Sequence, residues 1–199
     1  IQKHQKTQGS TGKGIAPCAG DKFYRHGIRL EDINDPLKIK YFKNIWDDKE
    51  RVSPLWGNVL CEGAQGFWLD INFGNYPYVT SSTTLPYSAC SLGFPPQKIR
   101  DIYGAVKIYD TRVGTDPDFD NLPDDPVLQR IAEVGQEYGS TTGRLRKVNW
   151  LNLDKLEKAL QISGTTHVII SKIDILEKVG VFRFLYLGKE FKFDSLQEM

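Results

Sequence analysis

The stretch Thr166–Leu176, THVIISKIDIL, joins an unbroken apolar run to a short charged segment. Val168, Ile169 and Ile170 are three consecutive β-branched residues. Such a run is typical of a strand that is covered on both faces, as in a parallel sheet. Parallel sheets belong to folds in which strands alternate with helices. The stretch therefore predicts an α/β fold.

Strands and helices alternate along the rest of the chain. Helices are predicted where a capping residue and an apolar face occur together, at 35–49, 125–140 and 153–164. Strands that run into polar loops are predicted at 57–66, 104–114 and 166–176, and a pair of strands with a turn near Gly188 at 179–193. We expect one domain, residues 1–199, with a mostly parallel central sheet flanked by helices.

The second predicted helix is the most clearly marked. Asp125 is placed to cap it, with Pro126 at the first helical position and Gly139 at its end. Its inward face would consist of Leu128, Ile131 and Val134. The other two helices follow the same logic, with Asp35 as the cap of the first and Gly164 as the end of the third.

Composition excludes several classes of function. The chain has 199 residues, 40% of them hydrophobic, and a net charge of +1, which predicts no general attraction to nucleic acid or anionic membranes. No apolar run reaches the ~20 residues that span a bilayer. The three cysteines match no zinc-site spacing and indicate a reducing, cytoplasmic setting. The polar start without Met predicts that the chain is a fragment.

Three Gly-rich or charged loops follow the predicted strands: EGAQG at 62–66, DTRVG at 110–114 and SKID at 171–174. In α/β sheets, ligand-binding loops lie at the carboxyl ends of the strands. The fold prediction and the predicted site therefore coincide.

Two further loops are small, hydroxylated and basic: GSTGKG at 9–14 and GSTTGRLR at 139–146. The first lacks the spacing of a Walker A loop, but its amides, Thr11 and Lys13 suit phosphate oxygens. In the second, two guanidinium groups suit carboxylates or phosphates, which they bind bidentately. The alternative for both is a solvated surface loop.

SKID resembles the base-reading loop of guanine-nucleotide proteins. The carboxylate of Asp174 would accept from two donors on guanine, and the stem of Lys172 would lie along the base. The alternative is an ion pair between Lys172 and Asp174 at the strand end. In the segment 62–82, the amide of Gln65 lies on a Gly-rich loop that allows close approach of a ligand, although its aromatic residues also suit simple packing.

Taken together these strings resemble the adenylosuccinate synthetase family over roughly residues 9–187. The matching strings occur in the family's order: GSTGKGIAPC, DKFYRHGIR, EGAQGFWLDINFGNYPYVTSS, DTRVGTDP, EYGSTTGRLRKVNWLNL and SKIDIL. The resemblance implies part of a P-loop NTPase-like fold. It also implies a ligase of purine nucleotide biosynthesis. Such a ligase phosphorylates the 6-oxygen of IMP with GTP and then joins L-aspartate to the 6-position of the purine.

The resemblance also implies roles for ten residues. For the monophosphate these are Thr11, Arg25, Gln65, Thr80 and Arg144, with Gln65 also the catalytic residue that stabilises the 6-phosphoryl intermediate. For L-aspartate they are Val113, Thr142, Arg144 and Arg146, and for GTP they are Lys172 and Asp174. Because Arg25 matches an arginine that reaches the partner subunit's IMP, a homodimer is expected.

The chain departs from the family pattern in one respect. The Gly-rich triphosphate loop has no counterpart, and the catalytic Asp and His of the family belong to the same absent part. We therefore expect the Mg²⁺ ligands outside this chain and no metal ligands within it. We also expect the isolated chain to be inactive. Two alternatives remain: a phage-type 2-aminoadenylosuccinate synthetase that uses dGMP, L-aspartate and ATP, and a non-catalytic guanine-nucleotide-binding module.

Overall fold

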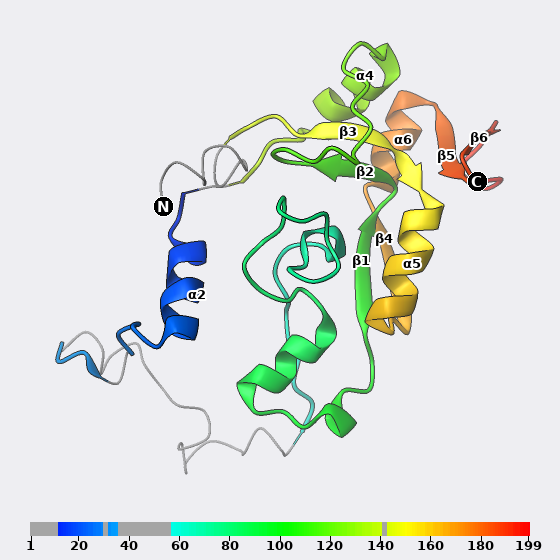
Figure 1. The fold of residues 1–199 in the computed structure, drawn as a ribbon. Helices are drawn as coiled ribbons and strands as arrows, with labels where there is room; N and C mark the ends of the chain where they lie inside the picture. Colours follow the sequence, from blue (N-terminus) through cyan, green and yellow to red (C-terminus); the bar gives the residue numbers. More distant parts are fainter. Residues whose placement is uncertain (1–11, 30–31, 36–56, 141–142) are drawn as a thin grey trace. The chain divides into compact units, whose positions relative to one another are not determined.

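The computed structural model describes residues 12–29, 32–35, 57–140 and 143–199 (Figure 1). The described residues fall into two compact units, a larger one that contains Gln65–Met199 and a smaller one that contains Gly14–Ala64. The prediction of a single domain over 1–199 stays a prediction. The helix expected at 35–49 lies, apart from Asp35, outside the described residues.

The larger unit contains parallel and antiparallel strand pairs (Figure 1). Strand β1 (Tyr103–Lys107) pairs in parallel with β4 (His167–Ser171). The other strands form a four-stranded sheet in the order β2 (Tyr109–Arg112), β3 (Lys147–Asn152), β5 (Phe182–Tyr186) and β6 (Lys189–Phe193). Strands β3 and β5 are parallel, whereas β2–β3 and β5–β6 are antiparallel. The predicted α/β class with parallel strands is confirmed, as is the strand pair at the end of the chain.

The backbone at Ile108 connects the two sheets. Ile108 separates β1 from β2, and its N–H donates to the carbonyl of Ser171 over 3.0 Å. The pairing with β4 therefore continues past Lys107, the last residue of β1. Because β1 and β4 are parallel and Lys107 lies opposite Ser171, both strands end at the same edge.

The helices among the described residues are α2 (Ile15–Tyr24), α4 (Pro126–Val134), α5 (Leu153–Ser163) and α6 (Ile173–Val179), with 3₁₀ turns η2 (Phe67–Leu69), η3 (Pro86–Leu92) and η4 (Pro96–Lys98). The predicted cap of α4 is confirmed, because the Asp125 carboxylate accepts from the N–H groups of Val127 and Leu128. Helix α5 ends at Gly164 as predicted, with φ of 64°, and its Asn152 cap accepts from the N–H of Lys155. Among the described residues, none of the helices combines the length and the apolar character that crossing a membrane requires.

One hydrophobic cluster holds the larger unit together. Helix α4 packs against α6 and β3, and α5 packs against β5 and β3. The buried cluster consists of Ile108, Tyr109, Leu128, Ile131, Ala132, Val148, Trp150, Ile175 and Leu176. This core joins β2, β3 and α4 to α6, whose start carries the predicted SKID loop.

Four local predictions were wrong. Helix α4 ends at Gly135 rather than Gly139, because the N–H of Glu137 turns back to the carbonyl of Ala132 over 2.9 Å. The predicted DTRVG loop begins only after Arg112, since β2 continues to that residue. Residues 57–61 form no strand, because no strand in the described parts of the chain pairs with them.

The fourth correction concerns β4, which was predicted to be covered on both faces. Val168, Ile169 and Ile170 are 44%, 54% and 43% exposed. Within the described residues β4 pairs only with β1, so one of its edges and much of its surface remain accessible. The apolar run thus identified the strand and its parallel pairing correctly, but not its burial.

Candidate functional site

The first basic loop leads into a helix. Thr11 lies outside the described residues, and Gly14, with φ of 85°, is the residue that begins α2. At the other end of α2, Arg25 adopts a left-handed conformation with φ of 62°, and its N–H donates to the carbonyl of Lys22. Arg25 is exposed and belongs to the smaller unit, so its role toward a partner subunit stays a prediction.

A buried carboxylate organises the segment that carries Thr80. Asp70 is 0% exposed and accepts from the N–H groups of Asn72 and Phe73 at 2.8 and 3.2 Å. It also accepts from the Thr83 hydroxyl at 2.9 Å and the Thr84 N–H at 2.7 Å. Burial alone raises the pKa of Asp70, but the four hydrogen bonds outweigh it and hold the pKa below its usual value. The loop is therefore closed around an ionised side chain.

Two polar contacts tie this segment to the loop that carries Val113. The guanidinium of Arg112 donates to the carbonyl of Tyr78 and lies 3.3 Å from the Asp116 carboxylate. The amide of Asn75 donates to the other oxygen of Asp116 over 2.9 Å. Thr80 itself is held by its N–H, which donates to the carbonyl of Leu69. The Thr80 and Val113 loops, predicted from separate motifs, are thus joined.

A second buried carboxylate lies at the base of the GSTTGRLR loop. Glu137 is 1% exposed, and its Oε1 accepts from the Tyr109 hydroxyl over 2.7 Å. Its Oε2 accepts from the Lys107 ammonium at 2.7 Å and from the Arg146 guanidinium at 2.9 Å. Burial alone raises the pKa of Glu137, but these three donors lower it below its usual value. One buried negative charge therefore faces two positive charges.

The backbone closes the same loop. The N–H of Arg146 donates to the carbonyl of Glu137 over 2.9 Å, and Tyr138 and Leu145 form an antiparallel bridge. Thr142 lies outside the described residues, whereas Arg144 is described and exposed. Arg146 is thus held at its backbone and at its side chain by one residue.

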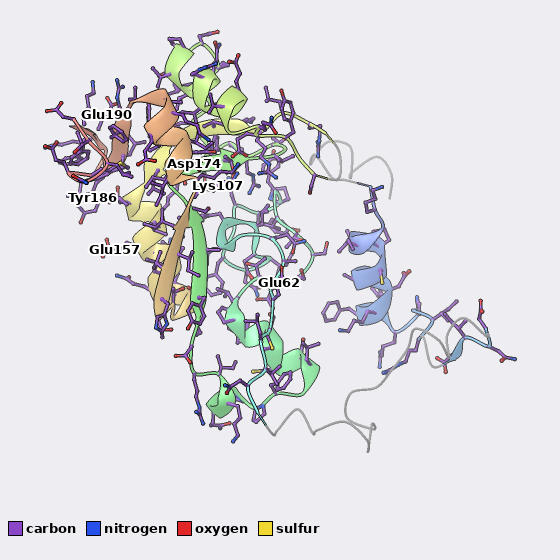
Figure 2. The ribbon with its side chains drawn as sticks, turned by 180° about the vertical axis from the view of Figure 1, so that it is seen from behind. Glu62, Lys107, Glu157, Asp174, Tyr186 and Glu190 are labelled. Atoms are coloured by element: carbon purple, nitrogen blue, oxygen red, sulfur yellow. The ribbon has the colours of Figure 1, made fainter. Side chains whose placement is uncertain are left out.

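The SKID loop lies beside this cluster. The Lys172 ammonium donates to the carbonyl of Gly135 over 2.9 Å, two residues before Glu137. The charge of Lys172 lowers the pKa of Lys107, after the larger effect of burial. Figure 2 shows Lys107 at the end of β1 and Asp174 at the start of α6, at the edge where β1 and β4 both end.

The ion pair considered between Lys172 and Asp174 is not present. The Asp174 carboxylate pairs instead with Lys178, one turn along α6, at 2.9 Å. This hydrogen bond is the main reason why the pKa of Asp174 lies below its usual value. Asp174 is largely exposed, so its carboxylate is ionised and accessible to a ligand.

Three predicted site residues have an unusual backbone conformation. The described non-glycine residues with positive φ are Arg25, Gln65, Gln136, Lys172 and Leu187. A left-handed conformation costs about 1–2 kcal/mol for a residue with a Cβ, and such residues are frequent at functional sites. That Arg25, Gln65 and Lys172 are among them is consistent with the roles predicted for these residues.

Several residues that shape the site were not predicted. Asp70, Arg112 and Glu137 lie within the strings that carry the family resemblance, but neither they nor Lys107 received a predicted role, and a lone Glu after a helix resembles any surface residue. Glu137 is buried because of the segments that pack around it in the folded chain, and a sequence does not display this packing. The surface hollow bordered by Asp120, Trp150, Arg183 and Glu190 contains none of the ten predicted residues.

The described residues do not fit a magnesium site. Nowhere in these parts of the chain do three histidine, cysteine, aspartate or glutamate side chains gather as ligands. Asp70 and Glu137 are already saturated by hydrogen-bond donors.

Known proteins share both the sequence and the fold. The family model for adenylosuccinate synthetase matches residues 52–186. The adenylosuccinate synthetase of Azobacteroides pseudotrichonymphae is 37% identical over 215 residues, covering 88% of this chain and 51% of its own length. That of Bacteroides fragilis is 36% identical over 208 residues, with 85% and 49% covered.

A solved structure agrees with these matches. The fully ligated adenylosuccinate synthetase from Plasmodium falciparum superposes with a TM-score of 0.78 at 29% identity, covering 98% of this chain and 56% of that protein. The chain thus spans about half the length of the relatives it matches. The recognised motifs, the fold and the extent of the matches agree, and the chain belongs to the adenylosuccinate synthetase family.

Proposed function

We propose that this chain supplies the aspartate-binding and guanine-binding loops of a ligase that joins L-aspartate to IMP with GTP. Its relatives are named adenylosuccinate synthetase, and a ligase of purine biosynthesis is the activity this name denotes. One observation supports the proposal most directly. Lys172 contacts Gly135 and Arg146 contacts Glu137, so the predicted guanine and aspartate loops are anchored on the same three-residue segment.

In the proposed reaction the γ-phosphoryl group moves from GTP to the 6-oxygen of IMP, which releases GDP. The amine of L-aspartate then attacks C6, the carbon that carries the phosphorylated oxygen. The bond between C6 and that oxygen breaks, inorganic phosphate leaves, and the amine loses a proton. Gln65 would donate its amide N–H to the 6-oxygen and so stabilise the charge that develops there. Arg144 and Arg146 would hold the two carboxylates of L-aspartate.

Lys172 and Asp174 would select the nucleotide. The ionised, exposed carboxylate of Asp174 offers two acceptor oxygens to the paired donors of guanine. Adenine has no such pair of donors on that edge. Thr11, Thr80, Val113 and Thr142 complete the proposed contacts with the monophosphate and L-aspartate. The Mg²⁺ of the proposed reaction would bind outside the described residues, in which no three such ligands gather.

Calorimetry on the full 199-residue chain tests the proposal. Binding of IMP together with L-aspartate supports a ligase, and weaker binding by Arg146→Ala is expected because a guanidinium partner is lost. A preference for dGMP over IMP would favour the phage-type reaction with ATP. Binding of GTP without a monophosphate or L-aspartate would instead identify a guanine-nucleotide-binding module. A homodimer is proposed as well, and sedimentation measures it independently.

A turnover assay tests the expected inactivity of the isolated chain. With GTP, IMP, L-aspartate and Mg²⁺ we expect no release of phosphate, because the family's triphosphate loop has no counterpart in these residues. Clear turnover would contradict that expectation while leaving the ligase assignment intact.

A further inference from the structure

We propose that Glu137 is a positioning residue that fixes Arg146 and Lys107 as a pair, and that Lys107 is a further ligand-binding residue for the dicarboxylate. The inference rests on the proposed function, in which that dicarboxylate is L-aspartate. Neither residue belongs to the ten that the sequence motifs identify.

The three side chains of the cluster differ in burial. Glu137 is 1% exposed, whereas the side chains of Lys107 and Arg146 are 24% and 27% exposed. The carboxylate is therefore the inner end of the cluster and the two cations are its outer end. An inner charge of this kind limits the rotamers of the cations without itself meeting a ligand.

The two cations also have more hydrogen-bond donors than their hydrogen bonds to Glu137 and Thr111 use. A lysine ammonium has three donors and a guanidinium has five. In the described residues the Lys107 ammonium uses two of them, toward Glu137 and the Thr111 hydroxyl at 3.1 Å. The Arg146 guanidinium donates to Glu137 through Nη1. Both cations thus retain donors that their partly exposed side chains can direct toward a ligand.

The charge of the cluster also suits an anionic ligand. One carboxylate faces Lys107 and Arg146, and Lys172 is close enough to lower the pKa of Lys107 further, after burial. The described cluster carries more positive than negative charge, which suits a ligand with two carboxylates. Because both cations contact the same Oε2 atom, their heads are held together at a spacing that Glu137 determines.

The test is the variant Glu137→Gln, which keeps the shape of the side chain and removes its charge. If the cluster attracted anions by net charge alone, this variant would bind them more tightly. If Glu137 positions the cations, L-aspartate binding in the presence of IMP weakens by about ten-fold, the loss typical of a hydrogen bond to a charged group. Binding of inorganic phosphate, which needs no fixed spacing, is expected to stay equal or to tighten.

A double-mutant cycle separates positioning from a general structural effect. In a background that carries both Lys107→Ala and Arg146→Ala, Glu137→Gln is expected to cause little further loss, because both residues it acts through are absent. A full additional loss in that background would overturn the inference. The matched control is Glu133→Gln on α4, the same change at an exposed glutamate that pairs with Arg130.

Two more outcomes are decisive. If the wild-type chain binds no L-aspartate with IMP, the proposed function fails and the inference fails with it. If the wild type binds, Arg146→Ala weakens binding and Glu137→Gln does not, the inference alone is overturned. Should Glu137→Gln not fold, Glu137→Asp keeps the buried charge but shortens the side chain, and undiminished binding by that variant would likewise overturn the inference.

Discussion

The loop around Asp70 and the cluster around Glu137 each bury an ionised carboxylate, but they compensate its charge differently. Asp70 accepts from three backbone N–H groups and one hydroxyl, all between residues 72 and 84. Glu137 accepts from two cations and a phenol, which come from β1, β2 and the end of the 139–146 loop. The first arrangement closes a loop on itself, whereas the second joins distant segments and leaves partly exposed cations. The partners of a buried charge, more than its burial, therefore distinguish the structural loop around Asp70 from the ligand-binding cluster that we propose around Glu137.

The largest expected effect is the loss of the Asp70 acceptor. Asp70→Ala leaves the Thr84 N–H and three other donors without their partner, so we expect the free energy of unfolding to fall by about 4 kcal/mol. Urea denaturation measures this fall in the free energy of unfolding. The exposed Asp124→Ala is the control, with a change of less than about 0.5 kcal/mol. A similarly small change for Asp70→Ala would show that its loop is held by other contacts.

A half-buried carboxylate, Asp110, sharpens the comparison, because it has fewer hydrogen-bond donors than Asp70 and Glu137. Asp110 accepts from the Asn152 N–H at 3.1 Å, and burial raises its pKa to about 6. Between pH 3.8 and about 6 the folded chain binds more protons than the unfolded chain, so the stability contributed by this group falls as pH rises.

The variant Asp110→Asn removes this titration and keeps an acceptor for Asn152. At pH 4 the variant and the wild type should have nearly the same free energy of unfolding. At pH 7 the free energy of unfolding of the variant should be higher by as much as about 3 kcal/mol. Urea denaturation across this pH range measures the difference. A constant difference would mean that Asp110 titrates alike in the folded and unfolded chains.

The next effect in size is steric and acts on the Glu137 cluster. A Cβ at Gly135 would lie 2.6 Å from the Tyr109 hydroxyl and 2.8 Å from the carbonyl of Ile131. Gly135→Ala should therefore destabilise the chain by about 2 kcal/mol, measured by urea denaturation. Gly66→Ala is the control, because a Cβ there has nothing within 4 Å. Equal stabilities for the two variants would show that Tyr109 can move without cost.

The elements that depend on local signals were predicted from the sequence. Asp125 followed by Pro126 predicted the start of α4, and Gly164 predicted the end of α5, because caps act on neighbouring N–H and carbonyl groups. The end of α4 was missed, since Gln136 takes a positive φ of 48° that its residue type does not favour. The exposure of β4 was missed, because it depends on which segments cover the strand.

The candidate site divides in the same way. Lys172 and Asp174 were predicted from a four-residue motif at a strand end, and Arg146 from a basic loop. Glu137 lies nine residues before Arg146 and thirty after Lys107 in sequence, so only the folded chain shows that the three meet. The motifs thus identified the residues for which we propose ligand contacts, whereas the supporting partner Glu137 is recognisable only from the packing of the folded chain.

The smallest expected effect tests whether the cations or the phenol stabilise Glu137. Tyr109→Phe keeps the buried ring and removes one neutral donor from Oε1, while Lys107 and Arg146 still pair with Oε2. We expect a loss of about 1 kcal/mol in the free energy of unfolding, the usual value of a single neutral hydrogen bond. Urea denaturation of Tyr109→Phe and Asp70→Ala compares their losses in the free energy of unfolding directly. Tyr186→Phe is the control for the loss of a phenol outside the core cluster. If Tyr109→Phe costs as much as Asp70→Ala, Glu137 depends on local neutral donors as Asp70 does, and the distinction between the two carboxylates disappears.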